Sequence, residues 1–327
     1  MSNYLQLIRL PNLVFLALIQ FLMWQVVLMP ILQTFGFDIS EDYTNIILLI
    51  TATVLIAAGG YVLNDYFDVK IDAVNKPSKQ VIGKTVSRRS AMLFYQLLTI
   101  IGVVSGLILS YLTRSFTLAF IFVVIPGLLW FYSSNYKRQF LIGNLVVAFT
   151  SALSILVVGL MELAVLQKMY GNLIFETGIP RLFYSWTGGF SIFAFLCTWI
   201  REIIKDMEDE KGDREMECRT MPIKWGIKNT KLFVCLLIVV AIAGLLLADS
   251  LTPFKGSLTI RYILFGIIIP FCILVYLLFK AKTPEDYHQA STLSKVIMVI
   301  GVLYSFVFYF LLAQTSGIKL FGVFLVQ

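Results

Sequence analysis

The chain has 327 residues, of which 59% are hydrophobic and 14% are charged, and its mean hydropathy is +0.86. This composition is far more apolar than that of soluble domains, and it excludes a protein built only from them. The net charge of +7 comes from basic residues that gather beside apolar runs. We attribute it to the positive-inside bias of membrane proteins and to attraction by membrane lipids, and we expect no nucleic-acid partner.

Nine apolar runs divide the chain, and each is long enough to cross a hydrocarbon core about 30 Å thick as a helix. They cover residues 12–33, 44–63, 91–112, 115–133, 141–166, 187–203, 231–248, 260–280 and 294–314. Pro, Gly, Asn, Asp and Lys gather between them, as expected for turns between helices. We therefore predict an all-α polytopic membrane protein, in which a bundle of about nine transmembrane helices forms a single domain over residues 1–327.

The distribution of Lys and Arg predicts the orientation of the bundle, because loops rich in these residues stay in the cytoplasm. With nine spans, one side of the membrane receives the N-terminus and the loops after the second, fourth, sixth and eighth spans. That side holds most of the basic residues, including Lys280, Lys282 and Lys295 after the eighth span. The N-terminus and the two polar loops near residues 64–90 and 201–230 are therefore expected to be cytoplasmic.

Cysteine and histidine chemistry is not expected in this chain. The four cysteines have no paired spacing, so we predict neither a disulfide framework nor a zinc site. The only histidine, His288, is expected in a surface loop. This argues against histidine as a metal ligand or as a general base.

Two short acidic segments are unusual in a chain with so few charges. The first motif, residues 64–72, reads N-D-Y-F-D-V-K-I-D, and the second motif, residues 206–213, reads D-M-E-D-E-K-G-D. Each carries aspartates at positions i, i+3 and i+7, which are Asp65, Asp68 and Asp72 in the first and Asp206, Asp209 and Asp213 in the second. On a continuous helix this spacing places three carboxylates on one face.

Carboxylates at the edge of a membrane are costly unless a cation neutralises them. Mg²⁺ prefers oxygen ligands and takes one or two carboxylates together with phosphate oxygens and water. We therefore interpret the two motifs as sites for two Mg²⁺ ions that hold a diphosphate between them. Such a site stabilises the charge on a departing diphosphate, as the ionisation of an allylic prenyl diphosphate requires. The apolar bundle would hold the isoprenoid tail and shield a carbocation from water.

The alternative interpretation of these motifs is a solvated surface, which acidic and basic residues in a loop usually form. Glu210 and Arg214, spaced i and i+4, are typical of an exposed helix. Because both motifs share one spacing and fall on the same side of the membrane, the solvated surface is the weaker interpretation.

Basic and aromatic residues near the motifs are candidates for binding phosphate. The candidates are Arg9, Lys79, Tyr132, Lys137, Arg201 and Lys205. Arg9, just before the first span, is either a snorkelling anchor or a phosphate clamp. Tyr132 and Lys137 are either ordinary interfacial residues or a cation–π contact and a phosphate contact.

At these residues the chain resembles the UbiA superfamily of intramembrane prenyltransferases. The family's first motif, N-D-x-x-D-x-x-x-D with a following N-x-P, is matched by Asn64, Asp65, Asp68, Asp72, Asn75 and Pro77. Its second motif, D-x-x-D-x-x-x-D, is matched by Asp206, Asp209 and Asp213. The resemblance implies that Asn64 and these six aspartates bind metal. It also implies catalytic roles for Asp68, Asp72, Asp206 and Asp209.

The resemblance further implies that the diphosphate and the acceptor are bound by Arg9, Asn64, Lys79, Tyr132, Lys137, Arg201 and Lys205. Two of these positions depart from the family. Lys79 stands where the family often has arginine, so a fork-like phosphate contact becomes a point charge. The spacing from Tyr132 to Lys137 is longer than is usual in the family.

Within the superfamily, residues 201–206 and 220–226 resemble the archaeal-type digeranylgeranylglyceryl phosphate synthases. These Mg²⁺-dependent enzymes transfer a geranylgeranyl group from its diphosphate to the free hydroxyl of geranylgeranylglyceryl phosphate. The resemblance implies the same partners here, a prenyl diphosphate and a lipid acceptor.

Two other functions remain open. An aromatic acceptor such as hydroxybenzoate is attacked at a ring carbon, whereas a glycerol acceptor reacts through oxygen and must lose a proton. With no histidine near the motifs, that proton would go to an aspartate, to water or to the departing diphosphate. A cation transporter would use the aspartates as ion sites, but such sites tend to lie near the midplane of the membrane, whereas these motifs are predicted at helix ends.

Overall fold

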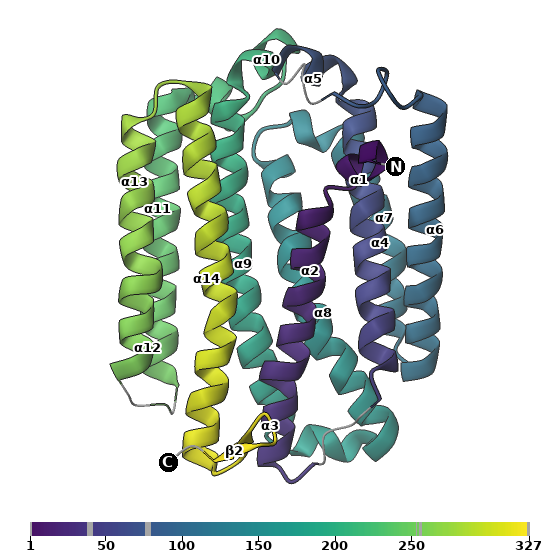
Figure 1. The fold of residues 1–327 in the computed structure, drawn as a ribbon, viewed down its shortest axis with the longest axis vertical. Helices are drawn as coiled ribbons and strands as arrows, with labels where there is room; N and C mark the ends of the chain where they lie inside the picture. Colours follow the sequence, from purple (N-terminus) through teal and green to yellow (C-terminus); the bar gives the residue numbers. More distant parts are fainter. Residues whose placement is uncertain (1, 38–41, 76–79, 253, 255–256, 326–327) are drawn as a thin grey trace.

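The computed structural model describes residues 2–37, 42–75, 80–252, 254 and 257–325. Within these residues, nine helical segments are long and apolar enough to cross a membrane, and Figure 1 shows them side by side. Six of them are single helices: Thr44–Phe67 (α4), Arg88–Thr113 (α6), Phe116–Ser134 (α7), Ile179–Glu208 (α9), Met221–Leu251 (α11) and Pro284–Ser316 (α14). The first span, Leu10–Thr34, consists of α2 (Leu10–Leu22), η1 (Met23–Leu28) and α3 (Met29–Thr34), and the fifth, Ile142–Glu176, consists of α8 (Ile142–Tyr170) and η4 (Gly171–Glu176). The eighth, Ser257–Lys280, consists of α12 (Ser257–Tyr262), η5 (Ile263–Ile268) and α13 (Ile269–Lys280). Each overlaps one predicted span, so the chain is an all-α, multi-pass membrane protein.

The outer surface of the bundle is apolar, as contact with lipid requires. On α6 the exposed side chains include Leu93, Leu97, Ile100 and Val104. Inside the bundle, one apolar cluster surrounds the first span, and a second lies between α9, α11, α13 and α14. The helices therefore present apolar side chains both to each other and to the membrane.

The first and eighth spans each pass through a π-helical turn just before a proline. In the first, η1 precedes Pro30, and in the eighth, η5 precedes Pro270. Proline lacks an N–H group, and its ring clashes with the carbonyl group four residues earlier. The wider turn accommodates the proline, so each helix continues across the membrane.

The last span begins about three turns earlier than the predicted start at residue 294. The hydroxyl of Thr283 accepts a hydrogen bond from the N–H of Asp286, and the Asp286 carboxylate accepts one from the N–H of Thr283. This capping box starts α14 in a polar stretch that a search for apolar runs misses. His288 and Lys295, both assigned to a loop from the sequence, lie on this helix.

Both acidic motifs cross a helix break at their middle aspartate. The first motif runs from α4 into α5 (Val69–Asn75), and the second runs from α9 into α10 (Glu210–Glu215). Asp68 and Asp209, between these helices, have φ/ψ angles of −89°/0° and −95°/7°, a region that is common in turns and active sites. The prediction that each triplet lies on one continuous helix is therefore wrong. Aspartate favours turns and helix ends because its side chain competes for backbone hydrogen bonds.

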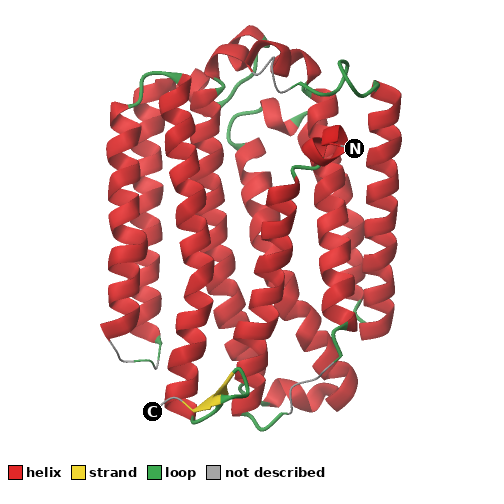
Figure 2. Ribbon diagram, in the orientation of Figure 1, coloured by secondary structure: helices red, strands yellow, loops and turns green. Residues whose placement is uncertain are grey.

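The segments near 64–90 and 201–230, predicted as loops, are largely helical in the described part. The remaining short elements are α1 (Ser2–Leu7), η3 (Tyr136–Arg138), β1 (Lys319–Leu320) and β2 (Phe324–Leu325). Figure 2 shows the strands of the C-terminal hairpin at one end of the bundle. At the other end, α5 and α10 lie side by side near the N-terminus (Figure 1) and contact each other. We call this end the motif end; its orientation toward the cytoplasm stays a prediction.

A buried hydrogen bond ties the first span to the fifth. The indole Nε1 of Trp24, on η1, donates to Oε2 of Glu162, on α8, at 2.9 Å. Both residues are buried, with exposed fractions of 3% and 7%. An acidic side chain inside a transmembrane bundle is costly without a partner. The indole therefore stabilises the contact between η1 and α8.

We expect Trp24→Phe to lower the free energy of unfolding by about 1–3 kcal/mol, because Glu162 loses its donor while an aromatic ring is kept. Thermal unfolding in detergent micelles measures the change. Glu162→Gln is the matched control, since its amide oxygen still accepts the hydrogen bond. Equal stability of Trp24→Phe and the unmodified protein would contradict a stabilising role for this bond.

Candidate active site

A cavity of about 700 Å³ extends into the bundle from the motif end. Its walls come from α2, α4, α7, α8, α9 and α14. On α9 its lining residues extend from Asp206 to Phe190, a distance of roughly 24 Å at 1.5 Å per residue. Most residues at the motif end are charged or polar, whereas the deeper walls include Ile19, Phe122, Ile155, Phe190 and Val302. The cavity therefore joins a charged end to a long apolar chamber.

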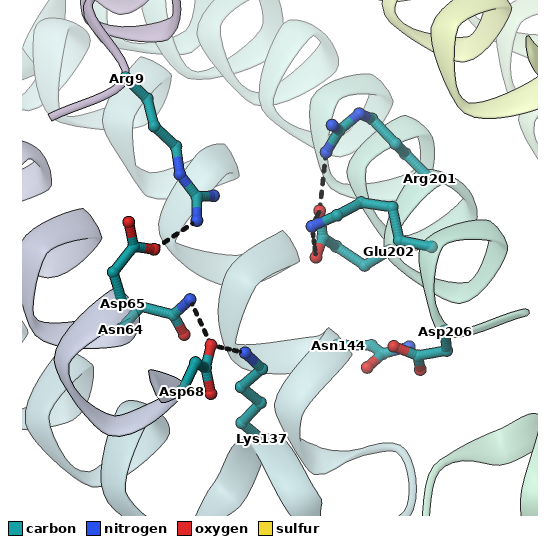
Figure 3. A network of polar contacts seen from close by, with 10 residues as sticks. Arg9, Asn64, Asp65, Asp68, Lys137, Asn144, Arg201, Glu202 and Asp206 are labelled. Atoms are coloured by element: carbon teal, nitrogen blue, oxygen red, sulfur yellow. Dashed lines mark hydrogen bonds and ion pairs between the residues drawn. The ribbon is translucent and has the colours of Figure 1, made fainter. Parts of the chain in front are cut away.

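The first motif is held by contacts with its own helix and with η3 (Figure 3). Asp68 is buried, and its Oδ2 accepts a hydrogen bond from Nδ2 of Asn64 at 2.9 Å. The ammonium group of Lys137 pairs with the same carboxylate. Burial opposes the charge of Lys137, but the nearby carboxylate of Asp68 outweighs burial and raises the pKa of this lysine. Lys137 is therefore protonated at physiological pH.

Arg9 joins the first motif to the start of α2. Its Nη2 donates to Oδ1 of Asp65 at 2.8 Å, and its guanidinium lies 5.0 Å from the centre of the Tyr61 ring. Its backbone has a φ of 53°, in the left-handed region that is costly for a residue with a Cβ. Burial acts to lower the pKa of Arg9, but the charge of Asp65 outweighs it and raises the pKa. Arg9 lines the cavity, whereas Asp65, its partner, is not among the lining residues.

The second motif is held by a residue from the neighbouring helix. Oδ2 of Asp206 accepts a hydrogen bond from Nδ2 of Asn144, in the first turn of α8, at 2.8 Å. Asp209 and Asp213 also line the cavity, at the helix break and on α10. Both acidic motifs therefore meet the same cavity.

The turn that carries Lys137 is fixed by close backbone packing. A Cβ at Gly143 would lie 2.9 Å from the Cα of Lys137 and 3.0 Å from the carbonyl oxygen of Tyr136. The backbone N–H of Arg219 donates to the carbonyl oxygen of Arg138 at 2.8 Å. This hydrogen bond ties the segment after α10 to the turn between α7 and α8. Only glycine at residue 143 allows η3 and the start of α8 to approach this closely.

About one turn before the second motif, α9 carries a buried carboxylate between two cations. Oε1 of Glu202 accepts a hydrogen bond from Nη1 of Arg201 at 2.8 Å, and Oε2 accepts one from Nζ of Lys205 at 2.9 Å. All three residues line the cavity. Figure 3 shows Arg201 and Glu202 on the opposite side of the site from the first motif. Glu202 therefore holds two cations in position on the cavity wall.

The structure brings most of the candidate site residues to this cavity. Those that line it are Arg9, Asn64, Asp68, Asp72, Tyr132, Lys137, Arg201, Lys205, Asp206, Asp209 and Asp213. Lys79 lies outside the described residues. The chemical roles of all these residues stay predictions.

Asn144, Glu202 and Lys295 are among the polar residues that line the cavity and were not candidates from the sequence. Glu202 could have been found from the sequence, because Arg201 lies one residue before it and Lys205 three residues after it on a predicted helix. No local pattern relates Asn144 to the site, because its hydrogen-bond partner Asp206 is 62 residues away. Lys295 was missed because it was counted among the basic residues of the loop after the eighth span, as part of the positive-inside bias.

The donor atoms at the motif end suit a hard metal ion. They are carboxylate oxygens and Oδ1 of Asn64, which is buried and has no hydrogen-bond partner among the described residues. In that part of the chain, no three Asp, Glu, His or Cys side chains form a ready metal-binding group. Mg²⁺ needs only one or two carboxylates when phosphate oxygens and water complete its ligands. The donor set therefore fits Mg²⁺ that binds together with a phosphorylated ligand.

The cysteine of the cavity is not activated for covalent catalysis. Cys218 lines the cavity, but burial, aided by the charge of Asp213, raises the pKa of the thiol to about 11. The thiol is therefore uncharged at physiological pH and is a weak nucleophile. His288, the only histidine, is exposed on α14 outside the cavity.

Comparison with known sequences identifies relatives across nearly the whole chain. The sequence profile of the UbiA prenyltransferase family matches residues 22–299. The digeranylgeranylglyceryl phosphate synthase of Sulfolobus acidocaldarius is 32% identical over 310 residues, which cover 93% of this chain and 96% of that protein.

Comparison with solved structures finds the same fold. A structure of digeranylgeranylglyceryl phosphate synthase matches with a TM-score of 0.61 and 26% identity, over 94% of this chain and 97% of the other. A UbiA homologue from Archaeoglobus fulgidus bound to DMAPP and Mg²⁺ matches with a TM-score of 0.54 and 14% identity, over 93% and 99%. With two acidic motifs on one intramembrane cavity and a family profile that covers most of its length, the chain belongs to the UbiA prenyltransferase family.

Proposed function

We propose that this prenyltransferase uses Mg²⁺ to transfer a geranylgeranyl group from its diphosphate to the free hydroxyl of geranylgeranylglyceryl phosphate. The observation that carries the proposal is the meeting of both acidic motifs at the charged end of a cavity with deep apolar walls. The similarity to digeranylgeranylglyceryl phosphate synthases, at 32% identity in Sulfolobus acidocaldarius, supports the choice of donor and acceptor.

The proposed diphosphate site lies between the two motifs. Two Mg²⁺ ions would be held by Asn64, Asp65, Asp68 and Asp72 on one side and by Asp206, Asp209 and Asp213 on the other. When bound, the ions neutralise the diphosphate as its charge develops and so favour cleavage of the bond to the prenyl carbon. The UbiA homologues from Archaeoglobus fulgidus bound to DMAPP and Mg²⁺ and to GPP and Mg²⁺ support a site that takes a prenyl diphosphate together with Mg²⁺.

Lys137 and Arg9 add fixed positive charge at the same end of the cavity. Both are protonated, and each contacts an aspartate of the first motif. A protonated side chain beside the diphosphate forms charge-assisted hydrogen bonds with its oxygens. The amide of Asn64 orients Asp68 through its Nδ2 hydrogen bond. These residues therefore position the leaving group.

The apolar chamber suits the isoprenoid tail of the donor. Its walls exclude water, which would otherwise capture a carbocation and turn transfer into hydrolysis. Tyr132 lines the cavity on α7, where the face of its ring can stabilise positive charge on the reacting carbon. The acceptor hydroxyl then attacks this carbon and loses its proton to an aspartate, to water or to the departing diphosphate.

The site is proposed to face the cytoplasm, because the segments at the motif end carry most of the basic residues. A prenyl diphosphate is charged at its diphosphate end, so it would reach the charged end of the cavity from the cytoplasmic side. Residues 1–327 are proposed to form a single transmembrane domain around the cavity.

Asp68→Ala and Asp209→Ala are each expected to lower turnover about 100-fold or more, because each removes a metal ligand from one motif. The assay follows labelled geranylgeranyl diphosphate into geranylgeranylglyceryl phosphate, with Mg²⁺ or with a chelator. Glu285→Ala, an exposed acidic residue on the first turn of α14, is the matched control. Retained turnover in either aspartate variant would refute the assigned roles.

Removal of divalent cations by the chelator is expected to stop product formation, and added Mg²⁺ is expected to restore it. Hydroxybenzoate is offered in parallel as an acceptor. If product forms with hydroxybenzoate and not with the lipid, the acceptor is aromatic and the proposed lipid acceptor is wrong. No product on either acceptor, with cation flux in vesicles, would favour transport.

Gly143→Ala is expected to lower turnover about tenfold to 100-fold, because its methyl group displaces Lys137 and so disturbs the leaving-group site. Gly127→Ala, on α7, is the control, since a Cβ there meets no atom within 4 Å. Steady-state kinetics on both variants gives the comparison. Equal turnover in the two would show that the position of Lys137 does not matter.

A further inference from the structure

Three cations gather where α9 packs against α14. Arg201 and Lys205 extend from α9 and Lys295 extends from α14, and all three line the cavity. We propose that Arg201, Lys205 and Lys295 form an anion site, here called the basic site, that binds the phosphate monoester of the acceptor lipid. The inference rests on the proposed transfer to a lipid acceptor, and it names the residues that recognise that acceptor.

The packing of the helices does not explain why residue 295 is a lysine. Lys295 lies about three turns into α14, inside a membrane-spanning segment. Among the described residues, no hydrogen bond or ion pair involves its ammonium group. A lysine inside a transmembrane helix is costly unless it faces a polar cavity or meets an anion. Its place on the cavity wall suggests an anionic ligand.

Arg201 also keeps a donor that no protein group uses. Its Nη1 donates to Glu202, whereas its Nε is buried and has no partner among the described residues. A guanidinium binds phosphate best through two parallel N–H groups, and Nε is commonly one of them. Glu202 therefore acts as a positioning residue that fixes Arg201 and Lys205 while leaving donors available.

The charges of the basic site favour a phosphate over a carboxylate. Glu202 contributes one negative charge against the three positive charges of the basic site, so the cations are only partly neutralised. A phosphate monoester carries about −1.5 to −2 charges at neutral pH, whereas an aromatic carboxylate carries one. The acidic motifs repel such a phosphate unless metal is bound, but the basic site attracts it directly. The basic site therefore distinguishes the two acceptor classes that the sequence left open.

The basic site borders the second motif, since Lys205 directly precedes Asp206, and it extends away from that motif to Arg201. Along α9, Arg201 precedes Asp206 and Asp209 by roughly 7–12 Å at 1.5 Å per residue. A diphosphate between the motifs and a phosphate at the basic site would then lie at different depths of one cavity. The glycerol hydroxyl of the acceptor would lie between them, near the carbon that it attacks.

The test measures binding of geranylgeranylglyceryl phosphate and of phosphate-free geranylgeranylglycerol to the full-length protein in detergent micelles. We expect the unmodified protein to bind the phosphorylated lipid about tenfold more tightly, and Lys295→Gln to lose most of this preference. Affinity for the phosphate-free lipid is expected to stay unchanged. Lys295→Arg keeps the charge and is expected to stay within about threefold of the unmodified protein. Lys282→Gln, an exposed lysine outside the cavity, is the matched control.

Kinetics separates the basic site from the proposed reaction. Lys295→Gln is expected to raise the KM for the acceptor about tenfold while the KM for geranylgeranyl diphosphate stays within about twofold. Equal binding of the two lipids, or unchanged binding in Lys295→Gln, overturns the basic site even if prenyl transfer is observed. Preferential binding of the phosphorylated lipid without any transfer supports the basic site and overturns the proposed reaction.

Discussion

The pairing of acidic side chains at the motif end with polar or charged partners from other segments is the interaction on which the arrangement of the site depends. Apolar packing is non-directional, so it holds the helices together without fixing how they meet. A buried charge without a partner is strongly destabilising, so each pair selects one arrangement of two segments. The pairs that do this at the cavity are Arg9 with Asp65, Lys137 with Asp68, and Asn144 with Asp206. The same contacts that define the fold at the motif end therefore also shape the site.

The parts of the structure that were predictable are those that local sequence determines. A helix that crosses a membrane needs a long apolar run, so all nine spans could be located from composition alone. The spacing of Glu210 and Arg214 predicted a helical ion pair, and the two side chains lie 2.5 Å apart on α10. The aspartates of the motifs were recognisable because few residue types bind a hard metal ion.

The parts that were not predictable depend on contacts between distant residues. Lys137 and Asp68 are 69 positions apart, and no periodicity in the sequence relates them. The helix breaks at Asp68 and Asp209 were missed because the i, i+3, i+7 spacing fits an unbroken helix equally well. The polar start of α14 was missed because hydropathy measures the mean of a window, and a capped polar helix start lowers that mean, so Lys295 was counted with the loop that precedes the span.

The hydrogen bond from Arg219 to the carbonyl oxygen of Arg138 has a consequence for how the two motifs respond to ligand. Arg138 follows Lys137, which holds the first motif, and Arg219 follows the second motif by a few residues. A displacement of either segment therefore acts on the other through this hydrogen bond, in addition to the contact between α5 and α10. We expect a ligand that moves one motif to change the affinity of the other motif for its own ligand, by the same factor in both directions.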